Sequence, residues 1–279
     1  MPMVEKKTKP IIKILIIIGI LTFVAITFIP YFWMLLSSLK NRVDLLSTTP
    51  KLIFKPTFAN YPEAFIEMGF LKYFINSIIV AVVALLASII IGVPCAYAIS
   101  RFDFQAKGHF FFFILTTRMA PPVAFALPLY IMFNKLGILG TRQGLIIAHV
   151  TFTLSFIIWI MKGFFDDIPI EIDQAAMTDG YTIFGAFMKV ILPLVRPGIV
   201  ATALFSFIFS WNEFLFALVL GGSASRTLPA AFPGLVTPHG TFWGQLCGVG
   251  TVVTIPIIIL AFVLEKDLVR GLSFGAVKQ

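Results

Sequence analysis

A short polar stretch, Asp173–Gly180 with the sequence DQAAMTDG, lies between two long apolar runs. Its two adjacent alanines have small side chains, which permit the close approach of another surface, and its acidic residues keep the stretch soluble. The composition predicts a docking element on the cytoplasmic face. A helix lying on the bilayer is the alternative, but such helices usually carry Lys and Arg on the polar face, and this stretch carries acids.

A second set of candidates consists of polar side chains inside or beside apolar runs, namely Arg118, Asn212, Glu213 and Gln245. Charged groups at membrane depth are expensive, and they normally face a cavity or each other. Two interpretations remain open. The residues line the path of a hydroxyl-rich solute whose donors and acceptors need polar partners, or Arg118 and Glu213 form a structural ion pair between the third and fifth apolar runs.

The sequence shows no constellation for catalysis or metal binding. The histidines His109, His149 and His239 lie in different segments, and each is more simply explained as an isolated surface or packing residue. Cys95 and Cys247 fall inside apolar runs without disulfide or metal spacing. There is no G-x-x-x-x-G-K-[ST] loop and no Gly-Lys dipeptide with which to cradle a nucleotide. We therefore expect no catalytic residue, no metal and no cofactor bound by this chain.

The composition predicts the kind of elements that position these residues. Of the 279 residues, 59% are hydrophobic and only 12% are charged, which is too apolar for a soluble domain of this length. The net charge is +8, but Lys and Arg are scattered singly, which argues against a nucleic-acid partner. We predict an all-α, polytopic membrane protein that lies in a lipid bilayer.

Six apolar runs are long enough, at about 20 residues each, to cross the hydrocarbon core of a bilayer as helices. The third is interrupted by Arg118 and by three prolines, and the fourth is the shortest. The runs cover residues 15–36, 76–99, 110–133, 145–161, 199–220 and 242–264.

The distribution of Lys and Arg predicts the orientation of these runs. Four lysines precede the first run, which places the amino end in the cytoplasm, and an even number of spans returns the carboxyl end there. The expected order is a cytoplasmic segment over 1–14, a first transmembrane helix over 15–36, an extracytoplasmic loop over 37–75, a five-helix core over 76–264 and a cytoplasmic tail over 265–279.

The longest cytoplasmic connection, residues 162–197, contains the polar stretch. Pro169 and the acids that follow it suit the first turn of a helix, and Gly180 suits the left-handed residue that ends one. A second helical piece over 181–190 carries apolar residues at helical spacing and is expected to end before Pro193.

The stretch DQAAMTDGYTIFGAFMKVILPLVRPG, from Asp173 to Gly198, resembles the EAA loop of permease subunits of bacterial ATP-binding-cassette (ABC) importers. It has the Ala-Ala pair, a Gly four residues after the second Ala, and a Leu-Pro at the far end. NYPEAF, TRMAPP, SWNEFLFAL, TLPAAF and GLSFGAVK resemble the carbohydrate-importer branch, the maltose-permease G-subunit type. The resemblance runs through nearly the whole chain. Gln174 departs from it by replacing the family's first acid, and Val190 departs by replacing the usual isoleucine.

This resemblance implies a type I ABC importer permease fold with six transmembrane helices and an EAA coupling loop over residues 164–197. It implies that the chain lies in the bacterial inner membrane and works with a sister permease, two ATP-binding subunits and an extracytoplasmic solute-binding protein, and that it moves a sugar, polyol or related carbohydrate. ATP and Mg would be used by the partner subunits. The residues that couple to the ATPase would be Asp173, Gln174, Ala175, Ala176, Asp179 and Gly180.

Other classes of protein fit the residues less well. A solitary secondary transporter is the alternative, but the six runs show no repeated halves and no series of intramembrane acids for ion coupling. A membrane-embedded enzyme would need clustered His, Asp or Glu at the interface, and no such set is present. The final residues, GLSFGAVKQ, are either a frayed chain end or, as the resemblance implies, reach the ATPase interface.

Overall fold

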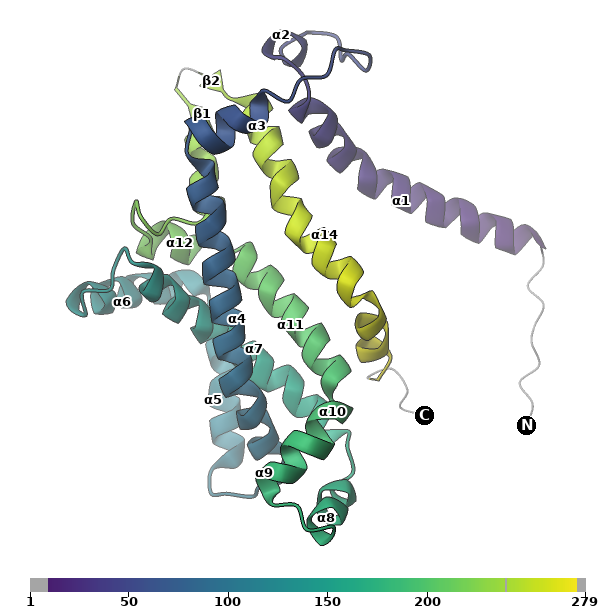
Figure 1. The fold of residues 1–279 in the computed structure, drawn as a ribbon, viewed down its shortest axis with the longest axis vertical. Coiled ribbons are helices and arrows are strands. Elements are labelled where there is room, and N and C mark those ends of the chain that lie inside the picture. The colour runs from purple at the N-terminus through teal and green to yellow at the C-terminus, as the bar shows by residue number, and fades with distance from the viewer. Residues whose placement is uncertain (1–9, 239, 275–279) are drawn as a thin grey trace. The chain divides into compact units, whose positions relative to one another are not determined.

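The computed structural model describes residues 10–238 and 240–274, and they fall into two compact units. The first unit contains the residues up to Gly69 together with Leu235–Thr254, and the second contains Phe70–Gly234 and the residues from Ile255. Nearly all elements are helices (Figure 1). Among the described residues the strands are β1 (Val236–Thr237) and β2 (Gly240–Thr241), which form one short antiparallel pair. The predicted all-α class is confirmed.

In the first unit, α1 (Pro10–Ser38) contains the first predicted span and extends it at both ends. The buried side chain of Asn60 donates hydrogen bonds to the main-chain carbonyls of Ser38 and Lys40, both at 2.8 Å. These bonds tie the end of α1 to the loop that follows. That loop contains the short helices α2 (Arg42–Leu45), α3 (Asn60–Pro62) and η1 (Glu63–Glu67).

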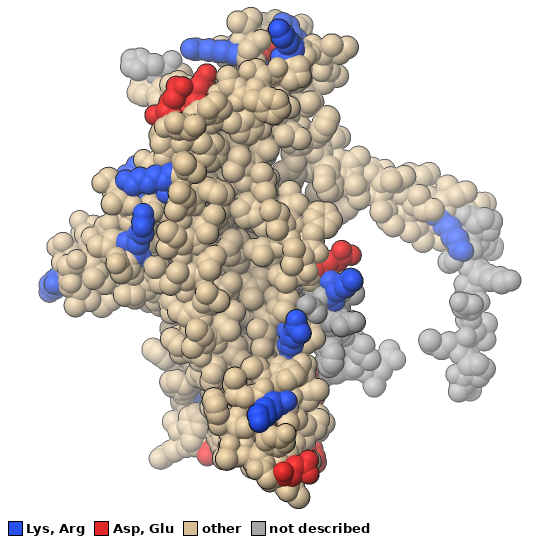
Figure 2. Space-filling model, viewed as in Figure 1, with Lys and Arg blue, Asp and Glu red and all other residues tan. Residues whose placement is uncertain are grey.

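The second unit is built on α4 (Phe70–Arg101) and α7 (Arg142–Asp166), which pack together along much of their length, and α11 (Arg196–Trp211) packs against both. The hydroxyls of Ser88 and Thr153 form a buried hydrogen bond of 2.6 Å between α4 and α7, a contact typical of membrane helix pairs. The charged residues of α4 lie near its two ends, and Figure 2 shows mostly uncharged side chains between them. α4 begins at Phe70, six residues before the predicted start of the core.

The third apolar run is not one straight span. Residues 110–133, predicted as a single run interrupted by prolines, lie in α5 (Lys107–Met119) and α6 (Pro122–Lys135), whose axes differ by 97°. Ala120 and Pro121 have extended backbones, because a residue that precedes a proline is disfavoured in the helical conformation. The two prolines therefore turn the chain sharply between the helices.

The fifth run, predicted over 199–220, is also broken. α11 ends at Trp211, and α12 (Leu215–Leu220) begins after a gap of three residues. The carboxylate of Glu213 accepts hydrogen bonds from the main-chain N–H groups of Phe216 at 2.8 Å and Ala217 at 3.0 Å. This carboxylate satisfies donors that a continuous helix would have paired internally, so a new helix starts here.

Four helices are long and apolar enough to cross a membrane on their own, and the number reaches six if each of two bent pairs counts as one span. The second bent pair joins residues 183–194 to α11 at 75°. The last helix, α14 (Trp243–Phe274), continues ten residues past the predicted end of its span, into the segment predicted as a tail. Residues 275–279 lie outside the described residues.

Two clusters of buried side chains form the core of the second unit. One joins α4 and α7 to the cytoplasmic loop predicted over 164–197 and includes Tyr97, Phe165 and Ile191. The other joins α6, α7 and α12 and includes Phe133 and Phe216. The remaining short elements are α13 (Leu228–Ala231) and η3 (Phe232–Leu235). The candidate coupling residues therefore lie next to the first cluster, and Glu213 lies next to the second.

Candidate functional site

The polar stretch forms α8 (Ile170–Thr178), as predicted, with Pro169 immediately before it. Gly180 ends this helix with a φ of +90°. Its N–H donates to the carbonyl of Met177, and the N–H of Tyr181 donates to the carbonyl of Ala176, each at 3.1 Å. This pair of bonds is the Schellman motif, which satisfies the last carbonyls of a helix and requires the left-handed residue at this place. The predicted role of Gly180 in ending the helix is confirmed.

Asp173 faces the interior of the chain. Its carboxylate accepts a hydrogen bond from the Tyr97 hydroxyl at 2.5 Å and pairs with Nε of Arg101 at 2.8 Å. The Arg101 and Asp173 side chains are only 9% and 7% exposed. Arg101 also donates to the carbonyl of Ile168 at 2.9 Å, just before α8 begins. One of the six predicted coupling residues thus fastens α8 to the end of α4.

The outward face of α8 combines polar and apolar side chains. Gln174, Ala175, Asp179 and Gly180 are exposed, whereas Ala176 is buried against the chain itself. Only one alanine of the pair is therefore free for the close approach of another surface. Exposed apolar side chains adjoin this face, and they are Met177, Ile183 and Phe184. In Figure 1, α8 and the helix that follows it lie beyond the lower ends of α4 and α7.

The second helical piece of the loop does not end before Pro193. α9 (Ile183–Ala186), η2 (Phe187–Ile191) and α10 (Leu192–Leu194) follow one another without a break. η2 is a π-helical turn, in which the N–H of Leu192 donates to the carbonyl of Phe187. A widened turn relieves the clash of a proline ring with the preceding turn, so the helix passes through Pro193.

The intramembrane candidates are only partly brought together. Arg118 and Glu213 line one cavity of about 290 Å³ in the second unit. The cavity is bounded by the bend between α5 and α6, by α7, and by the break before α12. Asn212 does not line it, because its side chain is exposed and donates to the carbonyl of Ile208 at 2.9 Å. Gln245 belongs to the first unit, where it donates a hydrogen bond to Glu63.

Of the two interpretations of Arg118 and Glu213, the structure does not support the structural ion pair. No salt bridge joins them among the described residues. The Arg118 guanidinium carbon lies 4.6 Å from the centre of the Phe209 ring and 5.2 Å from that of Phe156. Glu213 instead bonds to the first N–H groups of α12. The two charged groups contact different neighbours, although both line the same cavity.

His149, for which the sequence favours an isolated surface or packing role, is buried and packs beside Glu213. It is 1% exposed, and its Nδ1 lies 2.7 Å from the Ser210 hydroxyl. Its Nε2 lies 3.6 Å from a Glu213 carboxylate oxygen and has no hydrogen-bond partner among the described residues. Only the packing of α7 against α11 brings these residues together, so no local sequence pattern could have indicated the contact.

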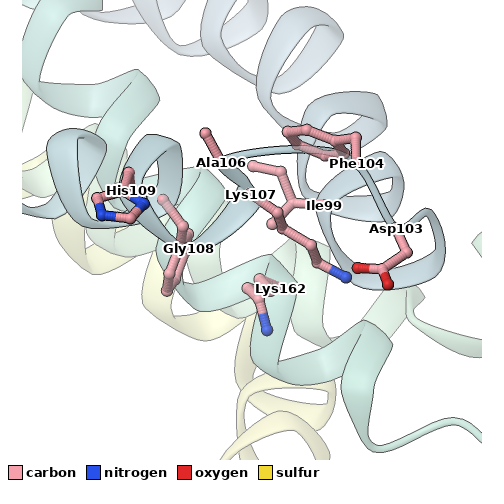
Figure 3. Close-up of a pocket in the computed structure, with 9 residues that line it drawn as sticks. Ile99, Asp103, Phe104, Ala106, Lys107, Gly108, His109 and Lys162 are labelled. Carbon is pink, nitrogen blue, oxygen red and sulfur yellow. The ribbon is translucent and has the colours of Figure 1, made fainter.

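A second hollow lies where α4 is joined to α5 (Figure 3). It is an open groove of about 640 Å³, lined by side chains of both charges that include Asp103, Lys107 and Lys162. Lys162 already pairs with Asp166 at 2.5 Å. Mixed charges give this groove no preference for an anion or a cation. Within the described part of the chain, no group of three or more His, Cys, Asp or Glu could hold a metal ion.

The chain is similar to known proteins over most of its length. The family model for the binding-protein-dependent transport system inner membrane component matches residues 88–272. Probable ABC transporter permease protein y4oR of Sinorhizobium fredii is 39% identical over 249 residues, which are 89% of this chain and 90% of that protein. The trehalose/maltose transport system permease protein MalG of Thermococcus litoralis is 33% identical over 270 residues, which are 95% and 97% of the two chains.

A solved structure extends the similarity to the fold. It is the crystal structure of a bacterial ABC transporter involved in the import of the acidic polysaccharide alginate, and one of its chains matches with a TM-score of 0.78 at 21% identity. The match covers 96% of this chain and 100% of that chain. At this level of identity, the likeness shows a shared fold.

Proposed function

This chain belongs to the family of binding-protein-dependent transport system inner membrane components, and we propose that the solute it helps to import is a sugar, polyol or related carbohydrate. The chain is a multi-pass permease subunit of an ABC importer. Its curated relatives are ABC permease subunits, so the alternative of a solitary secondary transporter is set aside. The carbohydrate class is supported by relatives such as the trehalose/maltose permease MalG.

The complete importer that we propose contains this chain, a sister permease, two ATP-binding subunits and an extracytoplasmic solute-binding protein. ATP and Mg are used in the ATP-binding subunits, and this chain has no catalytic role. The absence of a phosphate-binding loop from the sequence supports this division. The amino end, the coupling loop and the carboxyl end face the cytoplasm in this proposal, in agreement with the four lysines before the first span.

One observation carries the proposed mechanism: α8 presents an exposed face and is fastened to α4 by the buried pair of Arg101 with Asp173. We assign the exposed residues Gln174, Ala175, Asp179 and Gly180 to the contact with an ATP-binding subunit. The buried residues Ala176 and Asp173 hold the opposite face of α8 against the rest of the chain. Movement of the ATP-binding subunits would displace α8, and the buried ion pair would pass this displacement to α4 as a rigid rod.

The test is reconstitution of the complete complex in proteoliposomes. We expect carbohydrate uptake that requires ATP and the binding protein, and no uptake when a proton or sodium gradient replaces ATP. Ala175→Trp places a bulky side chain on the exposed face of α8 and should abolish co-purification of the ATP-binding subunits. Thr48→Trp is the matched control, because Thr48 is exposed in the loop predicted to lie outside. Equal capture by the two variants would refute the docking assignment.

A further inference from the structure

The cavity that contains Arg118 and Glu213 has the composition of a small-molecule site. Four phenylalanines line it, Phe125, Phe152, Phe209 and Phe216, and its polar lining is confined to a few side chains. Apolar walls with a small number of placed polar groups are typical of ligand pockets. Its volume of about 290 Å³ is at the lower end of the range for ligand pockets, which suits a single sugar unit.

Some polar side chains of this cavity already have hydrogen-bond partners within the protein, and one does not. The hydroxyl of Thr117 donates to the carbonyl of Ile114 at 2.7 Å and forms a second hydrogen bond, of 2.9 Å, with the hydroxyl of Ser155. The hydroxyl of Thr151 donates to the carbonyl of Ile147 at 3.0 Å. Each hydroxyl oxygen retains capacity to accept a further hydrogen bond. Both carboxylate oxygens of Glu213 accept main-chain N–H groups of α12. The charge of Glu213 is thus offset without Arg118.

Arg118 is the unsatisfied member of this set. Among the described residues its guanidinium contacts the rings of Phe156 and Phe209, and no hydrogen bond or ion pair reaches it. Cation–π contacts stabilise the charge but do not provide conventional acceptors for the N–H groups. A guanidinium has five such donors in a planar fork that matches a carboxylate, and leaving them unpaired at membrane depth is unfavourable.

We propose that Arg118 binds the carboxylate or sulfonate group of an anionic carbohydrate in this cavity. The phenylalanine walls pack against the sugar ring, and the hydroxyls of Thr117 and Thr151 accept hydrogen bonds from the hydroxyl groups of the sugar. Glu213 repels the anionic group, so that group is directed toward Arg118 and the neutral hydroxyls toward Glu213. This inference rests on the proposed function, and it narrows the carbohydrate to an anionic one.

The experiment measures solute binding to the purified membrane complex of this chain, the sister permease and the two ATP-binding subunits, by equilibrium dialysis in detergent without the binding protein. The probes are a hexuronate disaccharide and the matching neutral hexose disaccharide. We expect the hexuronate to bind more tightly. Arg118→Lys keeps the charge but loses the bidentate fork, and we expect it to weaken hexuronate binding by about tenfold with neutral binding unchanged. Arg226→Lys is the control, because Arg226 is exposed and does not line the cavity.

Three results of the binding measurement would overturn the inference. These are tighter binding of the neutral disaccharide, an equal loss for both probes in Arg118→Lys, and retention of hexuronate affinity in an assembled Arg118→Met complex. ATP-dependent uptake of neutral carbohydrate that hexuronate does not inhibit would also overturn it, while the proposed function would stand. If an assembled complex with active ATPase imports no carbohydrate of either charge, the proposed function fails, and this inference fails with it.

Discussion

At the scale of single residues, Gly180 is important for its backbone conformation and not for the space around it. An added Cβ would meet no atom within 4 Å, but the φ of +90° is one that side chains disfavour. Gly163, in α7, is equally open and does not have a positive φ. A comparison of substitutions at these two glycines therefore distinguishes the effect of backbone strain from the effect of steric crowding.

We expect Gly180→Ala to destabilise the end of α8 by about 1–2 kcal/mol, because the left-handed conformation costs that much for an L-residue. Uptake should fall relative to ATP hydrolysis, while membrane insertion stays normal. Gly163→Ala should leave both unchanged, since alanine is favoured within a helix. The ratio of solute imported to ATP hydrolysed, measured in proteoliposomes, checks this. A normal ratio in Gly180→Ala would be evidence against the role of this turn in coupling.

The pair of Arg101 with Asp173 gives a second prediction at the same scale. Asp173→Asn or Arg101→Gln leaves one buried charge without its partner, and we expect a loss of about 3–5 kcal/mol in the stability of the loop's attachment. The double variant should recover part of this loss. Asp179→Asn is the control, because Asp179 is exposed. We expect this variant to be as stable as the unchanged chain and to weaken only the capture of the ATP-binding subunit. Thermal unfolding of the purified complex provides the measurement, and additive losses in the double variant would contradict a direct pair.

The sequence predicts the helix formed by the polar stretch but not the directions in which its side chains point. Asp173 and Gln174 are neighbours on one helix, separated by about 100° around its axis. Which of them faces inward is decided by Arg101 and Tyr97, more than 70 residues away in the chain. The choice between the two interpretations of Arg118 and Glu213 could not be made from the sequence for a similar reason, because the charges alone do not show that Glu213 bonds to the first N–H groups of α12.

At the scale of elements, one carboxylate, that of Glu213, bonds to the first N–H groups of α12 after its break from α11. Glu213→Gln retains a single acceptor oxygen and loses the charge, so we expect about 1 kcal/mol less stability for α12. Amide hydrogen exchange over Leu215–Leu220 should become faster, while exchange in α11 stays the same. Asn212→Asp alters the adjacent exposed side chain and serves as the control. Unchanged exchange in Glu213→Gln would show that the cap does not stabilise this helix.

The apolar runs allowed the membrane helices to be located from the sequence, because a span of the required length is a strong signal. The breaks were harder to predict. Prolines indicated an interruption of the third run, although not a bend of 97°. The fifth run contains no proline at its break, and Pro193 lies inside a continuous helix because a π-turn precedes it. Both outcomes depend on local hydrogen bonds that a composition pattern does not contain.

At the scale of the whole molecule, the proposed orientation can be tested by labelling. In a chain with Cys95 and Cys247 replaced by serine, we expect Thr48→Cys to react with a membrane-impermeant maleimide in intact cells. Ala175→Cys should react only after the membrane is opened. Both positions are exposed, so a difference in labelling reports the side of the membrane. Labelling of position 175 in intact cells would reverse the orientation.

The length of α4 connects the coupling loop to the thickness of the bilayer. The two charged residues of α4, Lys72 and Arg101, are 29 positions apart, or about 44 Å along a helix. This distance matches a typical bilayer measured across both headgroup layers, about 40–45 Å. Arg101 also holds Asp173. If α4 spans the bilayer, we expect α8 to lie close to the headgroup level. Lipids with shorter acyl chains would force α4 to tilt and would move α8 relative to the membrane surface. Transport by this protein should therefore vary with acyl-chain length even when every residue of the site is intact.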